Sequence, residues 1–310
     1  MKKIISLMMA GLLMMAAFVG CAKDQGKEPE QSYGAASSNP DAGKDSFEAD
    51  NDIMVVSRED GSGTRGAFVE LFGVEEKDAN GNKVDMTTLE ATIANSTSVV
   101  MTTVAGNPYA IGYISLGSLN DTVKALKVDG VEATVANIKD GSYKIARPFN
   151  IATNKDGISE TAQDFIDFIL SKEGQAVVEK SGYIASVDDA KAYAGSKPAG
   201  KIVVAGSSSV TPVMEKLKEA YLELNPDAQI EIQQSDSSTG MSSAKDGICD
   251  IGMASRELKD SELESLNATV IAMDGIAVVV NKENTRTDIA KEDVKNIFTG
   301  EYLSWADLAN

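Results

Sequence analysis

The sequence predicts an α/β fold with two lobes. Apolar stretches of strand length alternate with amphipathic stretches of helix length from about residue 52 to the end of the 310-residue chain, and this alternation is typical of α/β proteins. About 260 residues exceed the usual size of one hydrophobic core, so we expect two lobes. Strands are expected near residues 52–56, 109–114, 145–152, 201–205, 228–233, 249–253, 268–272 and 275–281. Helices are expected near residues 65–72, 97–105, 160–170, 173–181, 212–224, 239–246 and 291–298.

The strands and helices are predicted from hydrophobic periodicity. A continuous apolar run such as Ile202–Ala205 is typical of a buried strand, and the alternation over Ala228–Gln234 is typical of a half-buried one. The segment Val213–Leu222 has apolar residues three and four positions apart, which is the pattern of an amphipathic helix. Most predicted helices follow a loop rich in Ser, Thr, Asp or Gly, as helix starts commonly do.

The first 21 residues have the pattern of a lipoprotein signal peptide. A positively charged start precedes an apolar segment over residues 4–19, which is too short for a stable membrane span, and Gly20-Cys21 resembles a lipoprotein cleavage site. Lipidation of Cys21 would anchor the mature chain to the outside of the cell membrane. The alternative is an ordinary signal peptide that ends near a cysteine. Residues 22–51 are polar and small, and we expect a flexible tether there.

Composition excludes several classes of function. The chain has no histidine, which removes Ser–His–Asp and Cys–His catalysis and the usual zinc ligand, so we expect no enzyme, no metal and no cofactor. A Walker A motif is absent, which excludes the ATPase of a transporter. After modification of Cys21 only Cys249 remains, so no internal disulfide can form. The formal net charge of −18 disfavours nucleic acid as a partner.

The segment from Ile53 to Phe72 has the pattern of an anion-binding loop. An apolar strand stops at Arg58, and Ser62, Gly63 and Thr64 precede an amphipathic helix, for which Thr64 is the expected N-cap. Glycine lets backbone N–H groups approach a ligand, and a helix start adds free N–H donors. Arg58 supplies a planar cation suited to a tetrahedral oxyanion, and Asp60 is close enough to orient it. The alternative is a polar turn with a surface Arg–Asp pair.

Two further loops repeat the order of strand, hydroxyl-rich loop and helix. Ser208 and Ser209 follow one strand, and Ser237 follows the next. Ligands of open α/β sheets bind where loops leave the carboxyl ends of strands. A single serine-rich loop is usually a turn, but the shared context of these loops favours one common site.

Several short motifs occur in a fixed order over the second half of the chain. They are Ala205–Pro212, Gln234–Gly240, Cys249–Arg256, Asp274–Asn281, and Ile297–Gly300 with Trp305. In this order they resemble the first half of the extracytoplasmic phosphate-binding proteins of ABC phosphate importers. A second set resembles the other half of the same family. It comprises residues 53–68, Asn95–Thr97, Ala105–Asn107 with Ala110–Tyr113, and Glu173–Gln175 with Gly182–Tyr183.

The order of the two halves departs from the family, whose second half comes first here. This order resembles a circular permutation, with residues 185–200 bridging the positions of the family's termini; a fragment of a longer chain with further repeats is the alternative. The resemblance implies the type II fold of periplasmic binding proteins, with two Rossmann-like lobes joined by a two-strand hinge. It places lobe I at residues 146–281 and lobe II at residues 52–145 together with 282–310. The hinge would lie near Ala146–Phe149 and Val278–Asn281.

The resemblance also implies which residues bind the ligand. It assigns phosphate contacts to Ser208, Ser209 and Ser237 in lobe I and to Arg58, Ser62, Gly63 and Thr64 in lobe II. Many family members have an aspartate that accepts the phosphate proton, where this chain has Ser255 followed by Arg256. We therefore treat Ser255 as a contact, and Asp60, Asp236 and Asp274 as candidate proton acceptors. Asp274 could instead only cap a turn. Arg256 could add a second cation or pair with an acidic surface residue.

The resemblance thus predicts a lipid-anchored monomer that captures inorganic phosphate and delivers it to the membrane subunits of an ABC importer. Three alternatives remain open from the sequence: a receptor for another oxyanion such as sulfate or molybdate, a phosphatase, and a surface interaction protein that reuses the fold.

Overall fold

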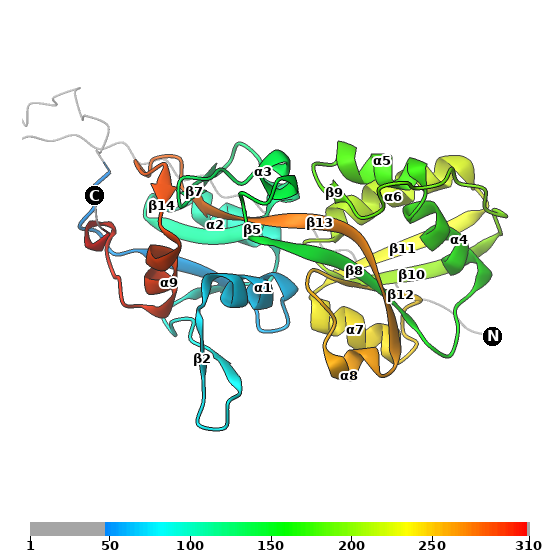
Figure 1. Cartoon of the computed structure of the whole chain (residues 1–310), viewed down its shortest axis with the longest axis horizontal. Helices are drawn as coiled ribbons and strands as arrows, with labels where there is room; N and C mark the ends of the chain where they lie inside the picture. Colours follow the sequence, from blue (N-terminus) through cyan, green and yellow to red (C-terminus); the bar gives the residue numbers. More distant parts are fainter. Residues whose placement is uncertain (1–46, 309–310) are drawn as a thin grey trace, which may run out of the picture. The chain divides into compact units, whose positions relative to one another are not determined.

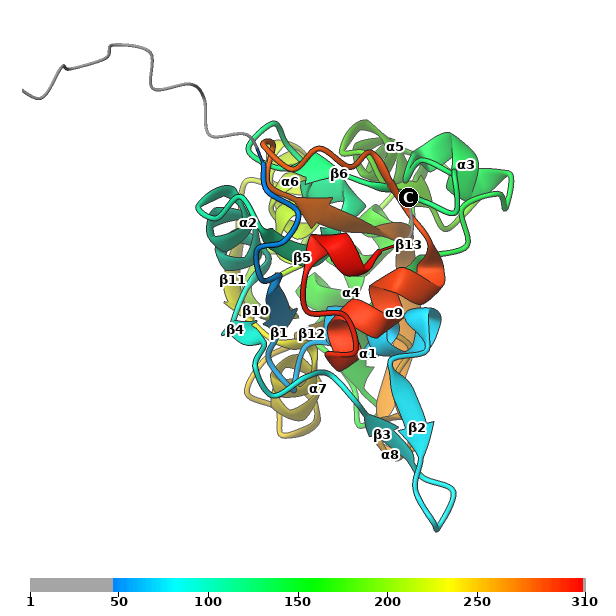
Figure 2. The ribbon, with the colours of Figure 1, turned by 90° about the vertical axis from the view of Figure 1, so that its left-hand side faces the viewer.

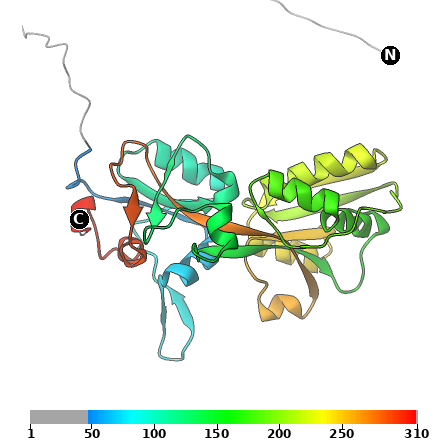
Figure 3. The same ribbon diagram turned by 45° about the horizontal axis from the view of Figure 1, so that its top comes forward.

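One long strand, β13 (Leu266–Val280), runs through both lobes of the computed structural model, which describes residues 47–308 (Figure 1). Its first part pairs antiparallel with β8 (Ala146–Asn154), whereas its last residues, Ile276–Val280, pair with β5 (Ala110–Ser115). The partner changes between Gly275 and Ile276, so β13 passes from one lobe to the other at this point. Figure 3 shows from another direction that β8 and β13 link the two lobes.

Lobe I contains the segments between β8 and β13. Its strands have the order β11-β10-β12-β8-β13, in which β10 is parallel to both of its neighbours and β8 is antiparallel to β12 and β13. Helices α4, α5 and α6 cover one face of this sheet and α7 covers the other (Figure 1). The elements are α4 (Glu160–Ile169), α5 (Lys172–Lys180), β9 (Ile184–Ala185), β10 (Gly200–Ser207), α6 (Thr211–Leu224), β11 (Ala228–Ser235), α7 (Ser237–Lys245), β12 (Ile251–Ala254) and α8 (Asp260–Leu263).

Lobe II contains the two remaining segments of the chain. Its strands have the order β13-β5-β1-β4, with β1 parallel to β4 and β5. A hairpin of β2 and β3 extends from this lobe (Figure 2). The elements are β1 (Met54–Arg58), α1 (Gly63–Phe72), β2 (Glu75–Lys77), β3 (Lys83–Asp85), β4 (Thr92–Ala94), α2 (Thr97–Ala105), η1 (Leu116–Ser118), β6 (Lys124–Ala125), β7 (Lys127–Val128), α3 (Val135–Lys139), β14 (Asp288–Ile289), α9 (Lys291–Thr299) and η2 (Trp305–Asp307).

Each lobe has its own hydrophobic core. In lobe I, Phe165, Leu217 and Tyr221 pack on the sheet, and in lobe II, Phe68 and Phe298 do so. Each of these side chains is completely buried. Because the cores are separate, the lobes are joined chiefly by the two hinge strands and by the polar groups that meet between them.

Segments from the two ends of the described chain lie side by side in lobe II. Ile53 N donates to Leu303 O at 2.7 Å, and Ala306 N donates to Ala49 O at 2.9 Å. The ring of Phe47 lies 6.2 Å from that of Trp305. Residues 47–51, which were expected to belong to the flexible tether, therefore pack against lobe II.

The segment that bridges β9 and β10 is fixed to lobe I by one buried carboxylate. Asp164, which is 4% exposed, accepts hydrogen bonds from Tyr193 Oη at 2.5 Å, from Ser196 N at 2.9 Å and from Tyr221 Oη at 2.7 Å. This segment, predicted as a linker over residues 185–200, is thus held on the surface of the lobe.

The predicted helices and strands match the main elements, with three corrections. The strands expected at 268–272 and 275–281 form the single strand β13, because Asp274-Gly275 continues the pairing with β8. The hinge segment expected at Val278–Asn281 lies beyond the change of partner, since Val278–Val280 pair with β5 inside lobe II. The N-cap of α1 is Ser62 rather than Thr64. The hairpin of β2 and β3 was not predicted.

The predicted signal peptide and lipidation site at Cys21 lie outside the described residues. Within residues 47–308, none of the helices has both the length and the apolar character needed to cross a membrane.

Candidate anion-binding site

Hydroxyl groups from both lobes meet where the strands end. Thr64 Oγ1 in lobe II lies 2.8 Å from Ser209 Oγ and 3.4 Å from Ser255 Oγ in lobe I. Thr97 Oγ1 lies 3.1 Å from Ser209 Oγ. Ser237 Oγ is 3.4 Å from Ser255 Oγ and accepts a hydrogen bond from Ser255 N at 3.1 Å. We call Thr64, Thr97, Ser207, Ser209, Ser237 and Ser255 the hydroxyl cluster; all six residues are buried.

Helix starts from both lobes surround the hydroxyl cluster. Thr64 lies in the first turn of α1, Thr97 begins α2, and Ser237 begins α7. Helix starts carry free N–H groups and a partial positive charge, which favour an anion. Folding therefore gathers hydroxyl groups from five separate chain segments around one point between the lobes.

Arg58 lies beside the hydroxyl cluster at the end of β1 and is 2% exposed. Its Nη2 donates to Ser208 Oγ across the lobes at 3.0 Å, and its Nε donates to Ala94 O at 3.2 Å. The carboxylate of Glu59 holds the fork at two points, with Nη2 to Oε1 at 2.6 Å and Nε to Oε2 at 2.7 Å. Because the Arg58 guanidinium is already held at several points, its side chain loses little conformational entropy when it binds an oxyanion.

The backbone of Arg58 is held by Tyr113 on β5. Tyr113 Oη accepts from Arg58 N at 3.1 Å and lies 2.9 Å from Ser57 Oγ. Its ring stacks on Phe68 at 3.9 Å. Burial raises the pKa of Tyr113 to about 12, so the hydroxyl stays protonated at physiological pH.

Glycine is required where the two lobes approach closely at Gly63. A Cβ at this position would lie 2.5 Å from Ser237 Oγ and 2.9 Å from Ser255 Oγ. Neighbouring Gly61 also approaches lobe I, because its O accepts from Ser238 N at 3.2 Å. The loop can therefore reach lobe I only without a side chain at position 63.

Most of the predicted contact residues come together. Arg58, Gly63, Thr64, Ser208, Ser209, Ser237 and Ser255 all lie at the hydroxyl cluster or beside it. Ser62 is buried next to them, and its Oγ accepts from Arg65 N at 3.3 Å as the N-cap of α1.

The three predicted carboxylates are engaged elsewhere. Asp60 has a 97% exposed side chain and pairs with Arg65 at 2.9 Å, so the prediction that it orients Arg58 is wrong. Asp236 caps α7 by accepting from Thr239 N at 2.9 Å. Asp274 is buried at the hinge. Arg256, near the position of the family's aspartate, forms a two-point ion pair with Glu262, with both N–O distances at 2.8 Å.

Three residues of the site were missed from the sequence. Thr97 ends the motif Asn95–Thr97, but only its distance to Ser209 marks it as a contact. Ser207 Oγ donates to Ser255 Oγ at 2.9 Å, and Ser207 directly precedes Ser208 and Ser209 in the chain. The role of Glu59 could not be predicted from the sequence, because the long side chain of Arg58 could pair with either Glu59 or Asp60.

Comparison with known proteins identifies the fold family. The family model described as "PBP superfamily domain" matches residues 38–173 and 191–310. The chain belongs to the PBP superfamily. The predicted fold class, two α/β lobes on a two-strand hinge, is confirmed by this match and by the structure.

Named relatives place the chain among the PstS-type members of the superfamily. It is 56% identical over 309 residues, 99% of this chain and 98% of the relative, to a protein of Streptococcus agalactiae serotype V named "Phosphate-binding protein PstS 2". A PstS 2 of Streptococcus pneumoniae serotype 4 is 46% identical over 257 residues, 83% of this chain and 88% of the relative.

A solved structure also superposes on this member of the PBP superfamily. It is a phosphate-binding protein of a phosphate ABC transporter from Streptococcus pneumoniae, with a TM-score of 0.66 and 45% identity. The match covers 84% of this chain and all of the other chain. The resemblance stated from the motifs is therefore confirmed at the level of the family.

Proposed function

We propose that this protein is the extracytoplasmic receptor of an ABC phosphate importer, which captures inorganic phosphate between its lobes and passes it on chemically unchanged. The observation that carries the proposal is the meeting of Arg58 with the hydroxyl cluster, to which both lobes contribute. Its relatives named PstS support phosphate as the ligand.

The proposed contacts are Arg58, Ser62, Gly63, Thr64, Ser208, Ser209, Ser237 and Ser255, joined by Thr97. Phosphate would take the place of the hydroxyl–hydroxyl bonds that now cross the lobes, accepting from the same groups. Charge-assisted hydrogen bonds contribute about 1.5–3 kcal/mol each, so five or six exceed the roughly 8 kcal/mol of micromolar affinity even after association costs.

The net charge of −18 does not prevent anion binding. Exposed charges more than about 8–10 Å away are screened at physiological salt, whereas buried donors act at contact distance. The acidic surface opposes approach, but the local field of Arg58 and the helix starts dominates at the site.

The proposal extends to localisation and partners. We propose anchoring through lipidated Cys21, a monomeric receptor, and delivery to the membrane subunits of the importer. We also propose that the chain order is a circular permutation. The proximity of Ile53 and Leu303 supports this order, because a chain could run directly between those segments without disturbing the fold.

Isothermal titration with phosphate from about pH 5 to 9, with sulfate as the competitor, tests the function. Tight one-to-one binding of phosphate supports the proposal. Failure to bind phosphate overturns it. Equal binding of sulfate would indicate a general oxyanion receptor, in line with the serine at position 255.

A further inference from the structure

A second polar cluster lies across the hinge. Arg147 on β8 and Asp274 on β13 pair at 3.2 Å, and both side chains are at most 2% exposed. The other oxygen of Asp274 accepts from Gly117 N in η1 at 3.3 Å. The carboxylate therefore connects the two hinge strands to η1 of lobe II.

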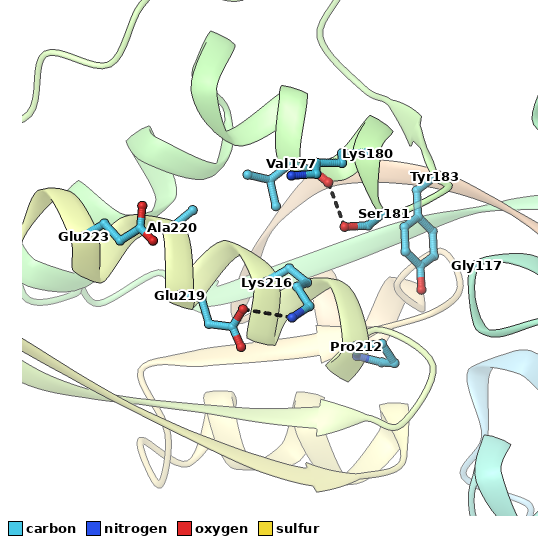
Figure 4. A pocket seen from close by; sticks show the side chains of 10 residues that line it. All are labelled: Gly117, Val177, Lys180, Ser181, Tyr183, Pro212, Lys216, Glu219, Ala220 and Glu223. Carbon is cyan, nitrogen blue, oxygen red and sulfur yellow. Dashed lines mark hydrogen bonds and ion pairs between the residues drawn. The ribbon is translucent and has the colours of Figure 1, made fainter.

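Tyr183 extends from lobe I onto the same part of lobe II. Its ring packs against Phe149 in the core of lobe I, with 5.4 Å between the ring centroids. A Cβ on Gly117 would lie 2.2–2.6 Å from the Cζ, Cε1 and Oη atoms of this ring, so the ring lies directly on the glycine backbone. Figure 4 shows Tyr183 next to Gly117 at one end of a cavity of about 530 Å³ that Pro212 and Lys216 also line.

Several polar atoms of this cluster are buried without a partner. They are Tyr183 Oη, Ser115 Oγ, Ser118 Oγ, and Nε and Nη1 of Arg147. Burial raises the pKa of Tyr183, and the neighbouring hydroxyls of Ser115 and Ser118 oppose this shift, although neither forms a hydrogen bond of normal distance and angle with it. A buried polar atom without a partner destabilises the arrangement that buries it. Separation of the lobes would lift Tyr183 Oη off Gly117, expose it to water and remove its part of that penalty.

We infer that Tyr183 is a positioning residue for ligand binding: its ring, packed on Gly117, is a latch that holds the lobes closed, and its unpartnered hydroxyl favours reopening. The inference rests on the proposed function for the identity of the ligand. Two opposing effects act through one side chain. Ring packing stabilises the closed arrangement, and burial of the hydroxyl destabilises it, so closure is tight enough to retain the ligand and loose enough to release it.

Two substitutions separate the two effects and have opposite expected signs. Gly117→Ala places a methyl group into the ring and disfavours closure, so the Kd for inorganic phosphate should rise at least about ten-fold, mainly through faster dissociation. Tyr183→Phe removes the unpartnered hydroxyl and keeps the ring, so the Kd should fall about three- to ten-fold through slower dissociation.

Matched controls exist for both variants. Gly66→Ala adds a methyl group where a Cβ meets no atom within 4 Å, and it should leave the Kd unchanged. Tyr143→Phe removes a hydroxyl that donates to Ile276 O at 2.7 Å, so it should lower stability without tightening phosphate binding.

The measurements are titration calorimetry, stopped-flow dissociation of phosphate, melting temperature and small-angle scattering with and without phosphate. The latch is supported if Gly117→Ala weakens and Tyr183→Phe tightens phosphate binding. It is overturned if both variants bind as the wild type does, or shift the Kd in the same direction.

If the wild type binds no phosphate, the proposed function fails, and scattering without ligand still tests the latch. Gly117→Ala must then have a larger radius of gyration than the wild type, and an equal radius overturns the inference.

Discussion

The two polar clusters between the lobes differ in how completely their groups are paired. At the hydroxyl cluster, Thr64 bonds to Ser209 and to Ser255 across the lobes. At the hinge, Tyr183 Oη and the Nε and Nη1 atoms of Arg147 are buried without hydrogen-bond partners. The first cluster offers an anion donors that are already oriented, and the second weakens the closed arrangement. Affinity should therefore be determined at the hydroxyl cluster and adjusted at the hinge.

The largest expected change in phosphate affinity comes from a substitution beside the hydroxyl cluster that leaves the hinge untouched. Arg58→Ala should raise the phosphate Kd at least about 1000-fold, because it removes the cation and its charge-assisted hydrogen bonds from the site. The protein should still fold, since the arginine lies between the lobes and outside both cores. Calorimetry and circular dichroism check both statements. A matched control is Lys201→Ala, which removes a surface cation paired with Glu231. Loss of folding in Arg58→Ala would contradict the placement of this residue.

The next comparison is between Gly63 at the hydroxyl cluster and Gly117 at the hinge, where the two lobes approach closely. Gly63→Ala should raise the phosphate Kd about 100-fold, because the new methyl group would collide with Ser237 and Ser255 inside the site. This effect should exceed that of Gly117→Ala at the hinge, which changes closure and no ligand contact. Titration calorimetry on both variants decides the order. A larger effect at Gly117 would assign affinity to the hinge and reverse the comparison.

For phosphate affinity, the orientation of the Arg58 guanidinium is expected to matter less than its charge. Glu59→Gln should weaken phosphate binding about ten-fold, since the neutral amide accepts at one atom only and holds the guanidinium less firmly. Asp60→Asn is the matched control and should bind as the wild type does, because the exposed carboxylate of Asp60 pairs with Arg65 instead. The opposite ranking in a binding assay would return the orienting role to Asp60.

The smallest expected effect is a pH dependence of folding stability that comes from Asp274 at the hinge. Burial raises the pKa of Asp274 from 3.8 to about 6, although Arg147 opposes the shift. The groups that face this carboxyl are Arg147 from β8, Ser115 and Gly117 from lobe II, and Tyr183. Between pH 4 and 6 the folded state holds a proton that the unfolded state has released. This contribution to stability is therefore complete below about pH 4 and is lost as the pH rises through 6.

Melting curves of the wild type and Asp274→Asn check this effect. The difference in melting temperature, wild type minus variant, should fall by about 5 °C as the pH rises from 4 to 6. Subtraction removes the contributions of other carboxylates, such as Glu262, whose pKa is lowered. A constant difference would show that Asp274 does not titrate in this range.

Several features of the site were predictable because they depend on local sequence. The strand that ends at Arg58 and the loop from Ser62 to Thr64 follow from an apolar run, glycine spacing and a helix start. Ser208 and Ser237 repeat the same pattern. Local periodicity is set by the element itself, so it is visible before the fold is known.

The features that were missed depend on contacts between distant segments. Thr97 joins the site only because α2 points at Ser209 from the other lobe. The strand β13 remains unbroken at Gly275 because both lobes supply it with pairing partners, which no local pattern indicates. The choice of Glu59 over Asp60 depends on side-chain direction at the end of β1.

A crystal structure of the protein with phosphate would test the central claim most directly. The account predicts a tetrahedral ion between the lobes, bonded by Arg58 and by hydroxyl groups of both lobes, including Thr64 and Ser209. Phosphate bound on one lobe alone, or at a position that Arg58 does not contact, would contradict it.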